Sequence, residues 1–223
     1  MKKFFLILIA GSILAVGNGF RMSLGIYVPD LLASTVFGAS AIGLTYGIFN
    51  LMWGSMSPIA GAFAEQKGYV KTFLIGFVGV SLSFYVTSLA VTPIHFLLGL
   101  GLIGGISAGV ISVPVVIGGV SKYFDDDKSR STVTGILMSI AASGMFIFTP
   151  INQYLVSAFG WSLSFQIVAF FYLLFIPMAF IFLLKKPEPK VKKKLTERRI
   201  LDVVTFAFKD KSYRYLILGF FVC

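Results

Sequence analysis

The chain consists of long apolar runs separated by short polar loops, and this pattern restricts the fold more than any single motif does. Six runs are long enough to cross the hydrocarbon core of a bilayer, which takes about 20 helical residues. They are Phe4–Val28, Ala41–Ala64, Thr72–Val91, Phe96–Val120, Thr132–Val156 and Ser162–Leu184. Because helices and closed barrels alone satisfy every backbone hydrogen bond in lipid, runs of this length predict an all-α membrane protein with a six-helix transmembrane bundle.

The composition supports this class. Hydrophobic residues make up 57% of the chain and charged residues 13%, whereas soluble domains carry about 25% charged residues. A net charge of +10 could indicate a nucleic-acid partner, but no basic patch with interleaved aromatics exists outside the loops between the apolar runs, so no nucleic-acid binding is predicted. The single cysteine, Cys223, excludes a disulfide framework and a cysteine-rich metal site, and we expect no cofactor.

The basic residues predict the orientation of the chain in the membrane. Of the 19 lysines and arginines, 18 lie in the N-terminal segment or in every second loop, and 11 of these fall between Lys185 and Arg214. Because cytoplasmic loops carry an excess of basic residues, we expect a multi-pass protein of the cell (inner or plasma) membrane with a cytoplasmic N-terminus.

Three segments follow from this pattern. Residues 1–184 are predicted to form the six-helix bundle, and residues 185–212 a basic cytoplasmic linker with a surface amphipathic helix. Residues 213–223 begin a seventh apolar helix, but its 11 residues extend only about 16 Å and cannot cross the bilayer. We therefore expect this seventh helix to be incomplete.

Arg21 departs from the loop pattern, because it lies inside the first apolar run. An arginine at bilayer depth costs a helix roughly 2.5 to 3.5 kcal/mol on insertion scales, so such residues usually face a protein-lined cavity on a ligand or ion path. At helical spacing Arg21 shares a face with Gly17, Asn18 and Gly25, a small and polar stripe suited to a cavity. The alternative is that Arg21 snorkels to the outer interface near Asp30, about 13 Å along the helix.

The second run supplies further candidate ligand contacts. Tyr46, Asn50 and Trp53 are the side chains in it that can offer a ligand hydrogen bonds or a stacking surface. Helix packing is the alternative role for each, because the same run has a face of small residues. We select Arg21, Asn18, Tyr46 and Asn50 as candidate substrate-binding residues, with Arg21 as the principal one.

Two enzyme-like motifs lack the residues that their chemistry needs. Gly105–Gly109 (GISAG) matches the serine-nucleophile pattern G-x-S-x-G, but His95 lies 12 residues before Ser107, about 18 Å along the same helix. The triplet Asp125–Asp127 resembles half of an aspartate-rich magnesium site, which needs a second carboxylate cluster. We therefore do not expect an enzyme, and a membrane-embedded hydrolase or prenyltransferase is the alternative from a different class.

Three further motifs are informative through their order. Gly19–Leu31 (GFRMSLGIYVPDL) has a basic residue followed by small and aromatic residues and a proline, and Lys122–Gly144 combines an aromatic pair, a basic cluster and spaced glycines. Between them, Gly61–Lys71 (GAFAEQKGYVK) has a glycine, an acidic residue and a second glycine. In this order the motifs resemble the N-terminal half of a major facilitator superfamily transporter, in the branch of monocarboxylate transporters and oxalate/formate antiporters.

The middle motif resembles the superfamily's gating loop between helices two and three. Its candidate residues are Gly61, Glu65, Gly68 and Lys71. Gln66 and Tyr69 stand where arginines are usual in that family, and Lys71 supplies a basic residue nearby.

The resemblance implies a secondary active transporter that works by alternating access, with two bundles moving about a substrate site near the membrane midplane. Its expected partners are the lipid bilayer, the C-terminal six-helix half and a small organic anion such as a monocarboxylate, carried by proton symport or anion exchange. We expect Arg21 to bind the carboxylate, because a guanidinium can hold both oxygens and keeps its charge at physiological pH. Export of a drug-like or lipophilic molecule is the alternative function, and it would not require Arg21.

Overall fold

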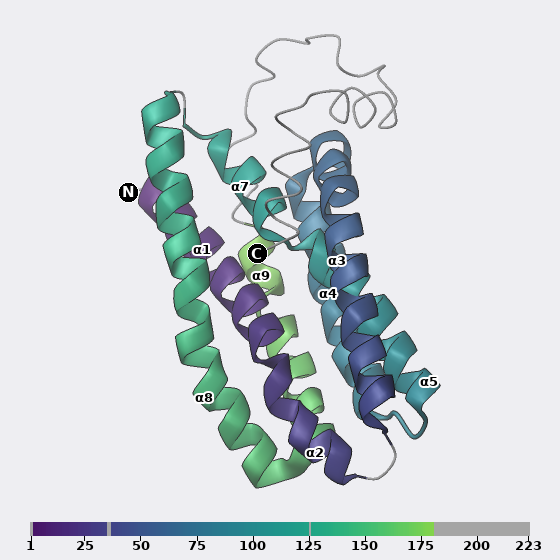
Figure 1. The fold of residues 1–223 in the computed structure, drawn as a ribbon. Helices are drawn as coiled ribbons and strands as arrows, with labels where there is room; N and C mark the ends of the chain where they lie inside the picture. The colour runs from purple at the N-terminus through teal and green to yellow at the C-terminus, as the bar shows by residue number, and fades with distance from the viewer. Residues whose placement is uncertain (1, 35–36, 125, 181–223) are drawn as a thin grey trace, which may run out of the picture. The chain divides into compact units, whose positions relative to one another are not determined.

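The computed structural model describes residues 2–34, 37–124 and 126–180, and the regular elements in these ranges are helices (Figure 1). In chain order they are α1 (Lys2–Met22), η1 (Ser23–Tyr27), α2 (Val28–Ala33), α3 (Ala39–Lys67), α4 (Tyr69–Ser88), α5 (Pro93–Phe96), η2 (Leu97–Gly104), α6 (Gly105–Val110), α7 (Val113–Ser121), α8 (Asp127–Leu174) and α9 (Ile176–Ala179). The all-α class is confirmed for these ranges. The predicted linker at 185–212 and the predicted seventh helix at 213–223 lie outside them.

Four stretches of the described chain are long and apolar enough to cross a membrane. They are Phe4–Ala33, Tyr69–Ser88, Pro93–Ser121 and Asp127–Ala179. α3, which contains the second predicted run, has 29 residues and is about 43 Å long. Its glycine, serine and asparagine residues make α3 less apolar than these four stretches, and it is not among them.

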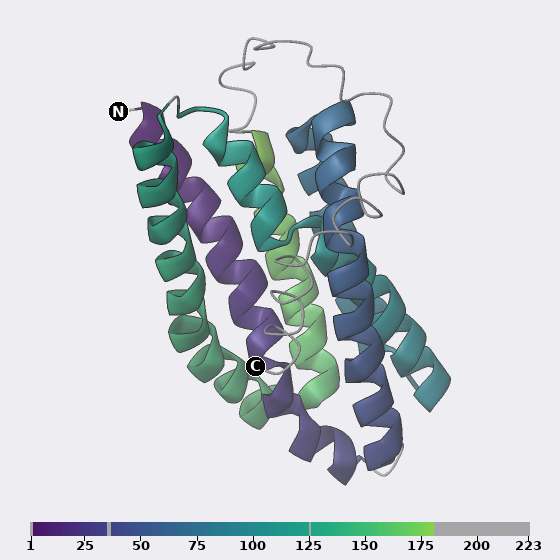
Figure 2. The same ribbon diagram turned by 45° about the horizontal axis from the view of Figure 1, so that its top comes forward.

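α8 reverses direction at Gly160, in the loop predicted between the fifth and sixth runs. Gly160 has φ 73° and ψ 172°, a conformation that residues with a Cβ rarely adopt. The next residue, Trp161, donates its backbone N–H to Asp30 Oδ2 at 2.7 Å, which caps the second helical segment. Figures 1 and 2 show the chain running along α8 and then returning toward α9.

The fourth predicted run, Phe96–Val120, consists of separate helical pieces. Its first part, η2, is π-helical, and the chain leaves helical geometry at Ile111 and Ser112 before α7 begins. Pro114 lies in the first turn of α7. Proline has no backbone N–H to donate and is well accommodated in the first turn of a helix, so the break falls just before it.

Glycines in the fourth run let α3 approach it at backbone distance. Added Cβ atoms at Gly101, Gly105 and Gly109 would lie 3.2, 2.6 and 2.8 Å from the carbonyl oxygens of Thr45, Phe49 and Trp53, respectively. Both sets of residues recur every four positions, so the helices touch along a line that we call the α3 seam. A side chain at Gly105 or Gly109 would force the two helices apart, and one at Gly101 would require a shift of a few tenths of an ångström.

α1 and α8 form a second close pair, lying side by side in Figures 1 and 2. A Cβ added to Gly19 would lie 2.8 Å from the carbonyl oxygen of Gly144. The fully buried Asn152 of α8 accepts a hydrogen bond from the Tyr27 hydroxyl at 2.9 Å and donates to Ser23 Oγ at 2.5 Å. Two helix pairs, α1 with α8 and α3 with η2 and α6, therefore organise the described bundle.

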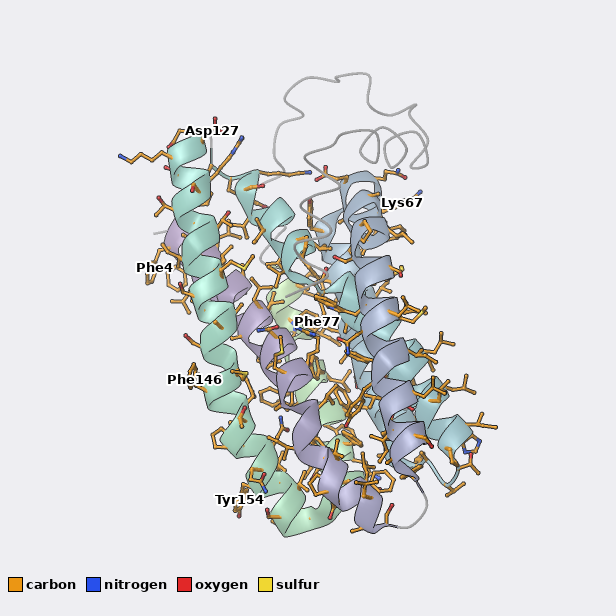
Figure 3. The ribbon with its side chains drawn as sticks, viewed as in Figure 1. Phe4, Lys67, Phe77, Asp127, Phe146 and Tyr154 are labelled. Carbon is orange, nitrogen blue, oxygen red and sulfur yellow. The ribbon has the colours of Figure 1, made fainter. Side chains whose placement is uncertain are left out.

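The outside of the bundle carries large apolar side chains. Phe146 and Tyr154 point away from α8 and are 77% and 68% exposed, whereas Phe77 is fully buried (Figure 3). Exposed apolar surface on this scale matches a lipid environment, so the chain is a membrane protein. Lys67 and Asp127, which flank two of the basic loops, lie at the same end of the bundle (Figure 3).

Candidate functional site

Arg21 lies where the first span changes from the α-helix α1 to the 3-10 helix η1, and its side chain is half-buried. The guanidinium lies over the Trp53 ring of α3, with Cζ 4.3 Å from the ring centroid. Its Nη1 donates to Asn50 Oδ1 at 3.4 Å and its Nη2 to Asn18 Oδ1 at 3.3 Å. The side chain therefore extends toward α3 inside the bundle and not along the helix toward Asp30.

Neighbouring backbone groups hold both amides with their oxygens toward Arg21. Asn18 Nδ2 donates to the Ala141 carbonyl oxygen at 3.1 Å, and Asn50 Nδ2 donates to the Tyr46 carbonyl oxygen at 2.9 Å. Each amide thus uses its N–H group on the backbone and offers its oxygen to the guanidinium. This orientation is favoured electrostatically, because the reverse would place N–H groups against a cation.

The Tyr46 side chain, the remaining candidate, has a different contact. Its hydroxyl donates to the Leu24 carbonyl oxygen at 2.8 Å, so it ties α3 to η1. Trp53, which was not selected from the sequence, lies beside Arg21. The sequence carries one signal for this position of Trp53, since Trp53 lies three residues after Asn50 and therefore on the same helical face.

A cavity of about 30 Å³ lies beside Arg21, with room for about two water-sized groups. Its lining consists of Leu14, Gly17, Asn18, Arg21, Leu24, Phe49, Trp53, Val80, Ser83, Phe84, Leu100, Gly104, Ala108, Ile111, Ser112, Val113 and Tyr172. Arg21 is the charged member of this lining, and most of the others are apolar.

The hydroxyl groups in the lining already have hydrogen-bond partners within the protein. Ser83 Oγ donates to the Gly99 carbonyl oxygen at 2.7 Å, Ser112 Oγ lies 2.7 Å from Ser57 Oγ, and the Tyr172 hydroxyl donates to the Val16 carbonyl oxygen at 3.4 Å. Arg21 is consequently the strongest hydrogen-bond donor that the lining of this cavity offers to a ligand.

Within the described residues, no carboxylate pairs with Arg21. The ion pairs there join Glu65 to Lys122 and Asp127 to Arg130. Two amide oxygens and an aromatic ring offset part of the charge of Arg21, but a partly buried cation without a counter-ion is unfavourable. The arrangement therefore favours a negatively charged ligand beside the guanidinium.

At the predicted gating loop, the contacts centre on Glu65. Its Oε2 lies 2.5 Å from Lys122 Nζ, just beyond the end of α7, and its Oε1 accepts a hydrogen bond from the Tyr69 hydroxyl at 2.5 Å. Lys122 Nζ also lies 4.9 Å from the centroid of the Tyr69 ring. These three side chains join the ends of α3, α4 and α7, although the sequence selected Glu65 alone among them.

The other loop candidates have separate positions. Gly68, at φ 98°, makes the turn from α3 to α4. Gly61 lies in α3 with open space where a Cβ would be, and Lys71 is exposed on α4. The predicted loop residues thus do not form one cluster.

The structure also places the enzyme-like serine. Ser107 is 8% exposed and packs against Gly79 of α4. In the part of the chain that the structure describes, no group of three or more His, Cys, Asp or Glu residues is arranged to hold a metal ion.

Comparison with known proteins gives the chain's relatives. A sequence model described as Major Facilitator Superfamily matches residues 7–223. Monocarboxylate transporter 11 of Mus musculus is 26% identical over 143 residues, which cover 64% of this chain and 31% of the relative. Monocarboxylate transporter 14 of Homo sapiens is 28% identical over 146 residues, with coverage of 64% and 28%. The hexuronate transporter of Bacillus subtilis (strain 168) is 25% identical over 213 residues, with coverage of 90% and 48%. The chain therefore spans less than half the length of these relatives.

Proposed function

Because the chain belongs to the Major Facilitator Superfamily, a family of membrane transporters, we propose that it acts in secondary active transport of a small organic anion such as a monocarboxylate. Transport proceeds by proton symport or anion exchange. The solutes named for the relatives, monocarboxylate and hexuronate, share a carboxylate group. That group is the chemistry that Arg21 would recognise.

The transport bundle in this proposal has six membrane-spanning helices and a cytoplasmic N-terminus. The reversal of α8 at Gly160 supports two spans in that helix, and the length of α3 supports one more. Alternating access requires a second six-helix half that moves against this one around the substrate.

The observation that carries the proposal is the half-buried guanidinium of Arg21 in a mostly apolar cavity, without a carboxylate among the described residues. A guanidinium binds both oxygens of a carboxylate with charge-assisted hydrogen bonds, which are shorter and stronger than those to an amide. Asn18 and Asn50 support the site through their oxygens, and Tyr46 supports it by fixing α3 against η1.

Gating belongs to the loop candidates Gly61, Glu65, Gly68 and Lys71 in this proposal. The contacts of Glu65 with Lys122 and Tyr69 support it, because they join three helix ends at one face of the bundle. These ends lie on the cytoplasmic side in the proposed orientation.

A panel of labelled carboxylates tests the function in proteoliposomes that contain the full-length protein. Formate, lactate, pyruvate, oxalate and glucuronate are compared for uptake. Arg21→Gln is expected to abolish uptake of the carboxylate that is transported best, while Arg21→Lys keeps the charge but loses the planar fork and retains part of it. Surface-accessibility labelling confirms that both variants insert equally. Full uptake by Arg21→Gln would refute the assignment of Arg21 to the substrate site, and no uptake of any of these carboxylates by the parent protein would favour export of a lipophilic molecule.

A further inference from the structure

The backbones that carry Arg21 and Trp53 belong to different helix pairs. Trp53 is part of the α3 seam, where a Cβ at Gly109 would lie 2.8 Å from its carbonyl oxygen. Arg21 follows two residues after Gly19, whose backbone is packed against Gly144 of α8. Both backbones are therefore held in place by packing that is independent of the contact between the two side chains.

The guanidinium of Arg21 crosses from one helix pair to the other. It is anchored on its own helix by Asn18 and reaches Asn50 and Trp53 on α3. The side chain has four rotatable bonds, so a charged group at its end would sample many positions if these contacts were absent. These contacts therefore fix the position of the positive charge in the cavity.

The ring of Trp53 and the two amides hold the cation in different ways. The attraction between a cation and an aromatic face acts on the whole charge and does not use a lone-pair acceptor. The amide contacts are hydrogen bonds of 3.3 and 3.4 Å, longer than the usual 2.7 to 3.2 Å. An arriving carboxylate accepts from the same N–H groups more strongly, so the amides are displaced while the ring contact persists.

We propose that Trp53 is a positioning residue of the anion site: its ring holds the Arg21 guanidinium in the cavity while the hydrogen bonds to Asn18 and Asn50 are exchanged for bonds to the carboxylate. This role rests on the proposed function. It assigns Trp53 a part in anion affinity, although Trp53 does not itself bind the carboxylate.

Tryptophan fluorescence tests the contact without any transport measurement. These 223 residues contain two tryptophans, Trp53 and Trp161, so Trp161→Phe in the full-length protein, together with phenylalanine at any tryptophan beyond residue 223, leaves Trp53 as the reporter. We expect Arg21→Gln to shift the emission of Trp53, and sodium lactate to change it in a saturable way when Arg21 is present. Emission that is identical with and without Arg21 would overturn the proposal even if carboxylate uptake is normal. An emission shift on Arg21→Gln together with no uptake of any carboxylate would instead overturn the proposed function.

Transport kinetics test the positioning role. Trp53→Leu removes the aromatic face, and we expect KM for the best-transported carboxylate to rise about tenfold, with the maximal rate within about twofold. Trp53→Phe keeps a weaker aromatic face and should restore KM to within about threefold of the parent protein. Trp161→Leu is the matched control, because it removes the other tryptophan away from the cavity and should leave KM unchanged. A KM that is unchanged in Trp53→Leu, or raised equally in Trp53→Phe, overturns the role. If Trp53→Leu does not insert, Trp53→Phe and the fluorescence comparison decide.

Discussion

Replacing Asn50 with aspartate tests whether the anion binds to the charge of Arg21. The substitution keeps the size of the side chain and converts an amide oxygen 3.4 Å from Arg21 Nη1 into part of a carboxylate. This carboxylate is tethered beside the guanidinium, so it competes with every anion that enters the cavity. The binding site would then be occupied by the protein itself.

Coulomb's law gives the size of the effect. Two unit charges 3.4 Å apart attract each other by about 1 kcal/mol in bulk water and about 5 kcal/mol at an effective dielectric constant of about 20. Arg21 is half-buried and Asn50 is exposed, so the environment lies between these limits. Since 1.4 kcal/mol corresponds to about a tenfold change, KM should rise by at least about fivefold and by up to several thousand-fold.

Uptake kinetics in proteoliposomes measure this change. Gln153→Glu is the matched control, because it makes the same amide-to-carboxylate change at an exposed position of α8 that does not line the cavity. We expect KM to be unchanged in this control. A KM for Asn50→Asp within twofold of the parent protein would show that the anion does not depend on the charge of Arg21.

Two further substitutions test the packing that supports the site, with thermal unfolding in detergent as the measurement. Gly109→Ala places a Cβ 2.8 Å from the Trp53 carbonyl oxygen and should lower the free energy of unfolding by about 1 to 3 kcal/mol. Gly54→Ala is the control, because its Cβ enters open space and should leave Tm unchanged or slightly higher. Equal Tm values for the two variants would contradict the close backbone contact at the α3 seam. Asp30→Ala removes the acceptor for the Trp161 N–H and should lower the free energy of unfolding by about 0.5 to 2 kcal/mol. Asp30→Asn keeps an oxygen acceptor and should retain most of the stability. An unaffected Tm in Asp30→Ala would show that this cap is dispensable.

Hydropathy predicted where the helices lie but not how regular they are. The apolar runs located the helices because each must satisfy its own backbone hydrogen bonds in lipid. The π-helical geometry of η2 was not predictable, because its hydrogen-bond register depends on how the run packs against α3 and α4. Pro114 did carry a local signal for the break at Ile111 and Ser112, and Gly160 for the reversal of α8.

Within the site, local spacing predicted part of the arrangement and tertiary packing decided the rest. Asn18 lies three residues before Arg21, so helical periodicity alone brings the two side chains together. The meeting of Arg21 with Asn50 requires α1 and α3 to face each other, which one sequence does not reveal. The contact of Trp53 with Arg21 and that of Tyr46 with Leu24 were not predicted for a similar reason, since the direction of each side chain depends on which helix lies opposite.

The α3 seam also limits how this part of the chain can be recombined with a related transporter. Three carbonyl groups of α3 lie against glycines, where an added Cβ would come within 2.6 to 3.2 Å of the carbonyl oxygen. If Ala39–Lys67 alone were replaced by the corresponding helix of a relative, the new helix would have a different shape where it meets these glycines, and they have no side chains that could adjust to it. The segment Leu97–Val110 must therefore be transferred together with α3, so a functional chimaera has to exchange two stretches that are distant in the sequence at the same time.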